Sequence, residues 1–335
     1  QPFRINVKEL FEQDRNYLVD FADVKGQAEV KRAMEVAAAG SHNLIMIGLP
    51  GSGKTMLAKR LPTILPPLTL DEALETTKIH SIAGLLPSNT AIISTRPFRS
   101  PHHTASDVSL VGGGPNAKPG EISFSHNGVL FLDELTEFKK NVLEVMRQPL
   151  EDRIVTISRS KITVQYPCNF MLIAAMNPTP AGSQKEASMY SDFDIQKFLS
   201  KISGPILDRI DLHIHVNPVK YQELSSKTES EKSEKVRERV IRAREIQIRR
   251  FSGRKGIYAN SAMGSKEIKE YCKIDSDCEN LMKMAITKLG LSARAYDRIL
   301  KVSRTIADLS GENSINASSI SEAIQYRSLD RTSWV

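Results

Sequence analysis

The residues best suited to chemistry begin in a glycine-rich segment, Gly48-Leu-Pro-Gly51-Ser-Gly53-Lys54-Thr55, which fits the pattern G-x-x-x-x-G-K-[ST]. Glycines let backbone N–H groups close around phosphate oxygens, and a following helix directs its positive end at them. Lys54 is expected to bridge the outer phosphates and the Thr55 hydroxyl to bind Mg²⁺. The segment therefore predicts nucleoside triphosphate binding, with a glycine-rich turn of no consequence as the alternative. The predicted contacts are Pro50, Gly51, Ser52, Gly53, Lys54, Thr55 and Met56.

Two carboxylates follow a second apolar run, Val129–Leu132, which predicts a strand. Asp133 suits magnesium held through water, and Glu134 suits a base that polarises an attacking water. Such a strand is weak evidence alone, but behind the first motif it indicates triphosphate hydrolysis. The chain contains no NKxD motif, which disfavours a GTPase, so ATP is the expected nucleotide.

A third apolar run, Phe170–Met176, ends in Asn177-Pro178. An amide at this point could order the water near the γ-phosphate, although an Asn before Pro is more often a turn residue.

Short apolar runs and helical patterns alternate from Phe21 to about Val219, which favours an α/β fold with a parallel sheet covered on both faces. The polar stretch SSKTESEKSEK is the best linker candidate, and beyond it all the signals are helical. The expected organisation is a remnant of a preceding region (1–19), a nucleotide-binding core (20–224), a linker (225–235) and a helical domain (236–330).

Length and composition narrow the class of protein. The 335 residues suggest two domains, and no apolar run approaches the roughly 18 residues of a membrane-spanning helix. Three cysteines without a CxxC pair argue against a disulfide framework or a Cys-rich zinc site, so a reducing cytoplasm is expected. The chain starts at Gln1 without a secretory leader, and we expect it to be part of a longer protein.

The net charge of +7 is concentrated in one stretch. Residues 231–260 hold ten Lys or Arg against four Asp or Glu. This bias hints at a polyanionic partner, and a solvated helix face is the equally weighted alternative.

Six segments together resemble the AAA+ ATPases of the magnesium-chelatase-related ComM/YifB group, over residues 20–330. They are FADVKGQ (21–27), GLPGSGKT, FRSPHHTAS (98–106), GVLFLDEL, AAMNP and SGPILDRIDLHI. The resemblance implies a P-loop AAA+ core with a helical lid and assembly into a ring, expected to be a hexamer of identical chains. In better-understood members it implies a motor that drives branch migration of DNA in recombination and natural transformation. Such proteins usually carry a Lon-protease-like domain ahead of this module.

The same resemblance assigns roles to residues that chemistry alone leaves open. It makes Asn177 sensor 1, Arg209 the arginine finger that acts on the neighbouring subunit's nucleotide, and Arg294 sensor 2 on the lid. Without it, both arginines would pass as ordinary surface residues. The residues it places on the adenine side are Val24, Gly26 and Gln27.

Two insertions bear on a DNA partner. The segment SLVGGGPNAKPGEISFSHNG is similar to the helix-2 insert of this group, and 153–166 predicts a hairpin with its turn at 158–161, in the place of the pre-sensor-1 hairpin. In related ring motors both loops face the central pore. The candidates for phosphate contacts are Lys118, Arg159 and Lys161, and the alternative is an exposed hairpin tip with ordinary basic residues.

The chain departs from the group in one respect. AMNP is typically followed by CPCG and a second cysteine pair, but here Thr179 and Pro180 follow, and Ser188 and Tyr190 stand at the second pair. These residues offer no thiolates, so no zinc is expected.

The histidines carry little argument on sequence alone. His213 and His215 share a strand face, but no third ligand is evident, so a metal site is disfavoured. His102 and His103 receive no chemical role, and core packing or loop ordering is the default.

The leading functional hypothesis is an ATPase that translocates DNA or drives branch migration. The alternative is a magnesium-chelatase-like ATPase that remodels a partner protein. A nucleotide-regulated scaffold is disfavoured because Lys54, Asp133 and Glu134 are all of the right chemical type. ATP and Mg²⁺ are the expected cofactors, and no membrane partner is expected.

Overall fold

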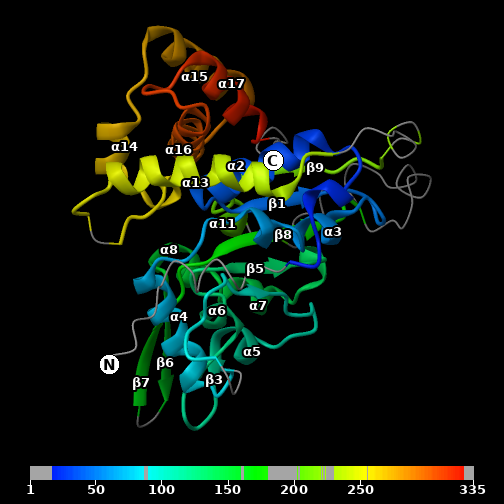
Figure 1. Ribbon diagram of the computed structural model, residues 1–335, viewed down its shortest axis with the longest axis vertical. Coiled ribbons are helices and arrows are strands. Elements are labelled where there is room, and N and C mark those ends of the chain that lie inside the picture. Colours follow the sequence, from blue (N-terminus) through cyan, green and yellow to red (C-terminus); the bar gives the residue numbers. More distant parts are fainter. Residues whose placement is uncertain are drawn as a thin grey trace, which may run out of the picture. The chain divides into compact units, whose positions relative to one another are not determined.

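The computed structural model has an α/β fold (Figure 1). The residues that it describes are 17–86, 90–159, 162–179, 202, 204–219, 221, 223, 230–254 and 256–327. The chain divides into two compact units. Unit 1 comprises 1–19, 67–174 and 201–206, and unit 2 comprises 20–66, 175–200 and 207–335.

The sheet is parallel and has the strand order β2-β5-β8-β1-β9. Its strands are β1 (Leu44–Ile47), β2 (Phe98–Arg99), β5 (Val129–Leu132), β8 (Met171–Met176) and β9 (Leu212–His215). Every residue of β1, β5 and β8 is buried, as expected for apolar runs with both faces covered. The predicted α/β fold with a parallel sheet is confirmed, and β5 has the predicted bounds.

Unit 2 carries the helical region. Helices α2 (Ala28–Gly40), α13 (Ser233–Arg250) and α16 (Ala293–Leu309) pack against one another. The remaining helices of this region are α14 (Ser265–Tyr271), α15 (Ser276–Leu289) and α17 (Ala317–Gln325). Side chains cap α15, α16 and α17 at the N-terminus, because Asp275, Ser292 and Asn316 accept hydrogen bonds from first-turn amides.

Helix α13 begins at Ser233, inside the stretch expected to be a linker. The Ser233 side chain is buried, and its hydroxyl accepts a hydrogen bond from the Phe21 amide (2.8 Å) and lies 2.7 Å from Thr63 Oγ1. Its own amide donates to Asp20 Oδ1 (3.0 Å). These contacts anchor the start of the helix, which the polar composition of the stretch did not reveal.

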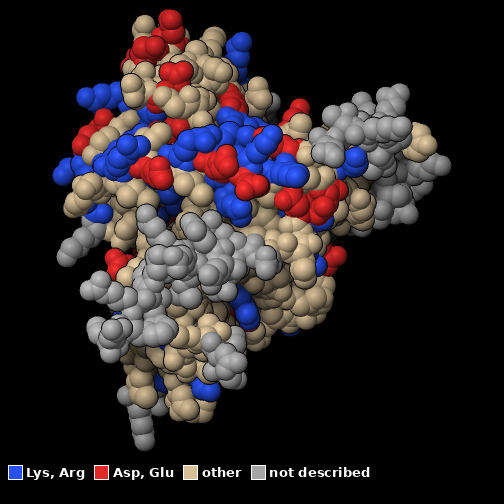
Figure 2. Space-filling view, viewed as in Figure 1, with Lys and Arg blue, Asp and Glu red and all other residues tan. Residues whose placement is uncertain are grey.

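The basic stretch serves the packing of α13. Arg244 and Gln247 are buried, and both donate to the Ala39 carbonyl (3.1 Å each) in the last turn of α2. Arg244 also donates to the Ala38 carbonyl (2.9 Å). Basic and acidic side chains alternate along α13 (Figure 2). Part of the local charge therefore satisfies the carbonyls of a neighbouring helix, as cations do at helix C-termini.

Unit 1 carries two antiparallel ribbons. One pairs β3 (Gly112–Gly113) with β4 (Lys118–Pro119), and the other pairs β6 (Ile154–Arg159) with β7 (Ile162–Pro167), which confirms the predicted hairpin. The helices of this unit are α4 (Leu70–Ile82), α5 (Asp107–Val111), α6 (Glu121–Phe124), α7 (Lys140–Glu144) and α8 (Arg147–Asp152).

The short helices among the described residues include α3 (Lys54–Ala58), α11 (Gly204–Leu207), and the 3₁₀ turns η1 (Phe21–Asp23), η2 (Leu61–Ile64), η3 (Leu135–Glu137) and η4 (Asn260–Ala262). The helix expected directly after the glycine-rich segment begins at Lys54 and ends at Ala58, and Pro62 lies within η2. In the part of the chain that the structure describes, no helix is long and apolar enough to cross a lipid bilayer.

Candidate functional site

The glycine-rich segment forms a tight loop between β1 and α3. Gly51 (φ 78°) and Gly53 (φ 94°) adopt left-handed backbone conformations, which glycine reaches without steric cost. A Cβ at Gly48 would lie 2.3 Å from the Val216 carbonyl oxygen, so only glycine fits there.

Lys54, at the end of this loop, contacts Asn177, which follows β8. Lys54 Nζ donates to the carbonyls of Gly48 (2.6 Å) and Leu49 (3.0 Å) and to Asn177 Oδ1 (3.2 Å). The Ser52 hydroxyl is buried and has no hydrogen-bond partner within the described residues. A buried ammonium, an unpaired hydroxyl and a glycine-built loop fit the phosphates of a nucleotide.

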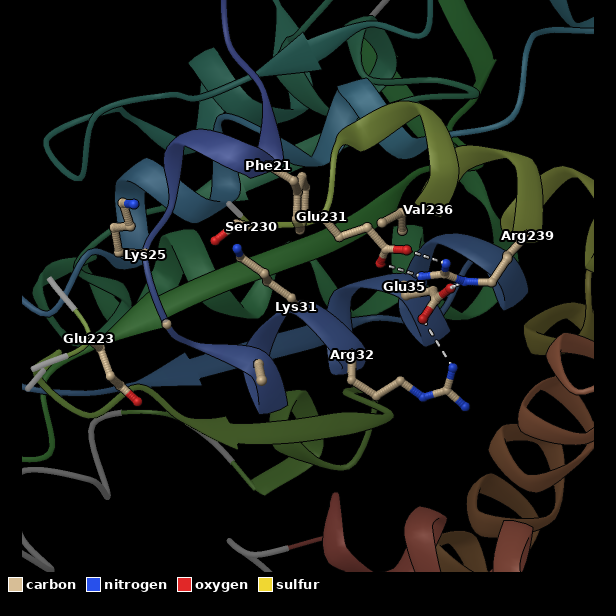
Figure 3. A pocket seen from close by; sticks show the side chains of 12 residues that line it. Phe21, Lys25, Lys31, Arg32, Glu35, Glu223, Ser230, Glu231, Val236 and Arg239 are labelled. Carbon is tan, nitrogen blue, oxygen red and sulfur yellow. Dashed lines mark hydrogen bonds and ion pairs between the residues drawn. The ribbon is translucent and has the colours of Figure 1, made fainter. Parts of the chain in front are cut away.

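The predicted adenine-side segment is fixed by hydrogen bonds. The Val24 carbonyl accepts from Lys31 Nζ (2.5 Å) and Ser230 Oγ (2.8 Å), and Gln27 Nε2 donates to the Asn217 carbonyl (2.6 Å). Burial lowers the pKa of Lys31. A cavity of about 440 Å³ lies beside this segment (Figure 3), and its lining includes Phe21, Lys25, Gly26, Lys31, Glu223 and Ser230.

The two carboxylates after β5 differ in their surroundings. Asp133 Oδ1 accepts a hydrogen bond from the Glu134 amide (3.0 Å). Glu134 has a left-handed backbone (φ 52°), an uncommon conformation for a residue with a side chain. Its Oε2 lies 3.0 Å from His103 Nδ1. The sequence did not assign His103 to the site. It showed only that His103 follows His102 in the segment FRSPHHTAS, which resembles the family but gives neither histidine a chemical role.

The two predicted arginines belong to segments that contact each other within unit 2. Arg294, in the first turn of α16, donates to Asp208 (3.2 Å), the residue before Arg209. One helical turn later, Arg298 forms an ion pair with Asp211. Arg209 itself is 7% exposed, so it is not the surface arginine that residue type alone suggests.

Asp211 joins the Arg209 segment to the helical region. Burial opposes ionisation of Asp211, but the Arg298 cation and a hydrogen bond from His42 hold the pKa of this carboxyl well below its usual range. His42 Nδ1 lies 3.4 Å from Asp211, and its Nε2 lies 2.8 Å from Thr305 Oγ1 on α16.

The two insertions meet at one end of unit 1. Lys118 pairs with Gly113 in the β3–β4 ribbon, and a Cβ at Gly113 would lie 2.7 Å from Arg159 Nη2. Tyr166 of β7 donates from its hydroxyl to the Ala117 carbonyl (3.1 Å). Lys118 and Arg159 are both exposed. We call residues 112–119, 154–159 and 162–167 the tip; β3, β6 and β7 mark it in Figure 1.

Several predictions fall outside the described residues, namely those on Lys161 and on Pro180, Ser188 and Tyr190 of the cysteine-free segment. Within the described residues, no group of three or more His, Cys, Asp or Glu is placed to hold a metal. His213 is buried on β9, where desolvation and the nearby Arg327 cation keep its pKa well below the usual value.

Comparison with known proteins identifies the family. The family described as magnesium chelatase, subunit ChlI, matches residues 20–224, and its C-terminal family matches residues 230–327. The chain belongs to the magnesium chelatase ChlI family. Within this family of AAA ATPases, it is 47% identical over 315 residues to competence protein ComM of Haemophilus influenzae and 43% identical over 315 residues to protein YifB of Escherichia coli. The resemblance to the ComM/YifB group is confirmed.

The alignments cover most of this chain but a smaller share of each relative. The alignments with ComM and YifB cover 93% of this chain but 61% of each relative, so the chain spans about three fifths of their length. A more distant relative is the magnesium-chelatase 67 kDa subunit of Heliobacterium mobile, 26% identical over 224 residues, which cover 58% of this chain and 30% of the relative.

Proposed function

We propose that this chain is the ATP-hydrolysing module of a ring-forming motor, a hexamer of identical chains, that translocates DNA or drives branch migration in recombination or natural transformation. The proposal that the motor acts on DNA rests on the structure of the tip. Two separate insertions, each with an exposed basic residue, are held together there by the Tyr166–Ala117 hydrogen bond and the close approach of Arg159 to Gly113. The 47% sequence identity to competence protein ComM also supports a role in DNA processing.

The chemistry proposed for the nucleotide site follows from the residue types and contacts. When bound, Mg²⁺ neutralises charge on the phosphates, and Thr55 and Asp133 are the residues that would hold it. Lys54 binds the outer phosphates. Glu134 polarises the attacking water, and Asn177, which Lys54 already contacts, orients it.

We propose that Arg209 acts as an arginine finger on a neighbouring subunit's nucleotide, and that Arg294 acts as sensor 2 on the lid and couples the nucleotide state to the lid angle. An arginine finger stabilises charge on the transferring phosphoryl group and makes assembly a condition of hydrolysis. The Arg294–Asp208 ion pair joins α16 to the segment that carries Arg209, which supports a link between the lid and the finger.

A partner protein is the second candidate for the substrate. Apolar side chains are exposed at or beside the tip: Val108 (51%), Ile154 (36%) and Ile162 (47%). Exposed apolar groups favour contact with a polypeptide. The basic stretch of α13 adds little to the DNA argument, because buried Arg244 binds carbonyls of α2.

The test is the ATPase rate without DNA and with single-stranded DNA, duplex and a four-way junction, over a salt series. The DNA motor predicts stimulation that is greatest with the junction and that falls as salt rises, because phosphate contacts release counterions. Rates indifferent to every DNA would favour a protein client.

Matched variants locate the contact. Lys118→Ala with Arg159→Ala should reduce the stimulation and leave the DNA-free rate unchanged. Arg249→Ala removes an arginine from the exposed part of α13 and should alter neither rate. Equal losses in both variants would argue against the tip.

A further inference from the structure

The cavity beside the predicted adenine-side segment is tied to the helix that leaves the phosphate loop. Arg60, which follows α3, donates to the Asp20 carbonyl (2.8 Å) and forms an ion pair with Asp23 (3.0 Å), and these two residues immediately precede the segment. The residues that line the cavity and the glycine-rich loop all belong to unit 2. In the proposed function, this cavity of about 440 Å³ receives the base of the nucleotide.

Three carboxylates of the described residues line this cavity, and arginines hold two of them. Glu231 accepts hydrogen bonds from Arg239 with both oxygens (2.6 and 2.8 Å). Glu35 accepts from the same arginine and from Arg32 (3.0 Å). Figure 3 shows these ion pairs, with the third carboxylate, Glu223, apart from them. Within the part of the chain that the structure describes, the Glu223 carboxylate has no hydrogen-bond or ion-pair partner.

Glu223 lies against the backbone of the adenine-side segment. A Cβ at Gly26 would lie 2.7 Å from Glu223 Oε2 and 3.3 Å from Val219 Cγ1, so both side chains approach this glycine closely. The next residue, Gln27, donates from Nε2 to the Asn217 carbonyl (2.6 Å) and so joins the two stretches of chain. The unpaired carboxylate therefore stands at the edge of the segment expected to contact adenine.

The neighbouring donors on this side of the cavity are already used. Lys31 Nζ and Ser230 Oγ both donate to the Val24 carbonyl (2.5 and 2.8 Å). A carboxylate only accepts hydrogen bonds. Adenine presents an amino group at position 6, which donates, whereas a 6-oxopurine such as guanine or hypoxanthine presents a carbonyl oxygen, which accepts. A carboxylate at this point thus attracts the first kind of base and repels the second.

We propose that Glu223 is a specificity-determining residue, which accepts a hydrogen bond from the 6-amino group of adenine. The proposal rests on the proposed function, in which ATP binds at this site. Two effects give the selection: a charge-assisted hydrogen bond is formed with a 6-aminopurine, and two acceptors are brought together with a 6-oxopurine. The side chain that chooses the base therefore lies beyond β9, far in sequence from the phosphate loop.

The experiment compares the binding of ATP with that of inosine triphosphate (ITP), whose 6-oxo group replaces the amino group. Dissociation constants are measured without DNA, by competition with a fluorescent nucleotide. Wild-type protein should bind ATP about tenfold more tightly than ITP, as expected for one hydrogen bond to a charged group. Glu223→Gln should bring the ratio close to one by tightening ITP, because its amide both donates and accepts. Glu223→Ala should bring the ratio close to one by weakening ATP.

The matched control is Glu231→Gln. It makes the same chemical change at a carboxylate of the same cavity, but one that Arg239 already holds. Its ratio of ATP to ITP affinity should equal that of the wild type. Because the readout is a ratio, a general loss of folded protein or of phosphate binding does not change it.

A wild-type ratio near one, or a ratio that stays at the wild-type value in both Glu223 variants, would overturn the proposal. If Glu223→Ala does not fold, Glu223→Gln decides alone. These measurements need neither hydrolysis nor DNA, so a protein that selects ATP through Glu223 but ignores DNA would keep this inference and lose the DNA motor. A wild-type protein that binds neither nucleotide would overturn both.

Discussion

Arg244 offers a direct test of why α13 is basic. Its guanidinium donates to the carbonyls of Ala38 (2.9 Å) and Ala39 (3.1 Å) and to Ser41 Oγ (2.7 Å). Each such bond contributes about 1 kcal/mol net, so Arg244→Ala should lower the free energy of unfolding by about 3 kcal/mol. For a chain of 335 residues, that corresponds to a fall of about 4 °C in the thermal midpoint.

The control is Arg249→Ala on the same helix. Arg249 is exposed and donates to the Glu245 carbonyl within α13, so its loss should change stability by no more than about 0.5 kcal/mol. Both variants remove one positive charge from the same stretch. Thermal unfolding, followed by circular dichroism, compares them. An Arg244→Ala protein as stable as Arg249→Ala would refute the assignment of this charge to helix packing.

Three further predictions follow from the site and the core. The free energy of unfolding should fall as the pH drops below about 6.5, because burial and the Arg327 cation keep His213 neutral in the folded protein while His213 of the unfolded chain takes up a proton. In denaturant titrations from pH 7 to 5.5, His213→Gln should reduce the slope of unfolding free energy against pH by up to about 1.4 kcal/mol per pH unit. An unchanged slope would contradict this prediction. Lys54→Ala should abolish nucleotide binding or turnover, whereas Glu134→Gln should bind ATP and stop hydrolysing it; undiminished phosphate release by the latter would exclude Glu134 as the base. Arg209→Ala should bind ATP without hydrolysing it, and mixing it with Lys54→Ala should restore part of the activity; no restoration at any ratio, with assembly verified, would count against a finger in trans.

The strands and the loop were predictable because their signals are local. An apolar run such as Val129–Leu132 predicts a buried strand from its own residues alone. The glycines of the segment Gly48–Thr55 indicate backbone conformations that few other residues adopt. The helices of the C-terminal region followed from the helical spacing of their apolar residues.

Pairs of polar residues far apart in sequence were not predictable. Nothing local distinguishes an arginine that binds a neighbouring helix, as Arg244 does, from one in solvent. The same holds for His103 and Glu134, whose contact depends on how the loop after β2 meets the end of β5. The start of α13 was misplaced for this reason too, since Ser233 is anchored by residues near the beginning of the chain.

The central claim is that ATP hydrolysis moves DNA. Its most direct measurement is the conversion of a labelled four-way junction with homologous arms into its branch-migration products. We expect conversion by the wild-type protein with ATP and Mg²⁺, and none by Glu134→Gln under conditions where that variant still binds ATP and junction. A wild-type protein that hydrolyses ATP and binds the junction but yields no products, or yields them equally with Glu134→Gln, would contradict the account.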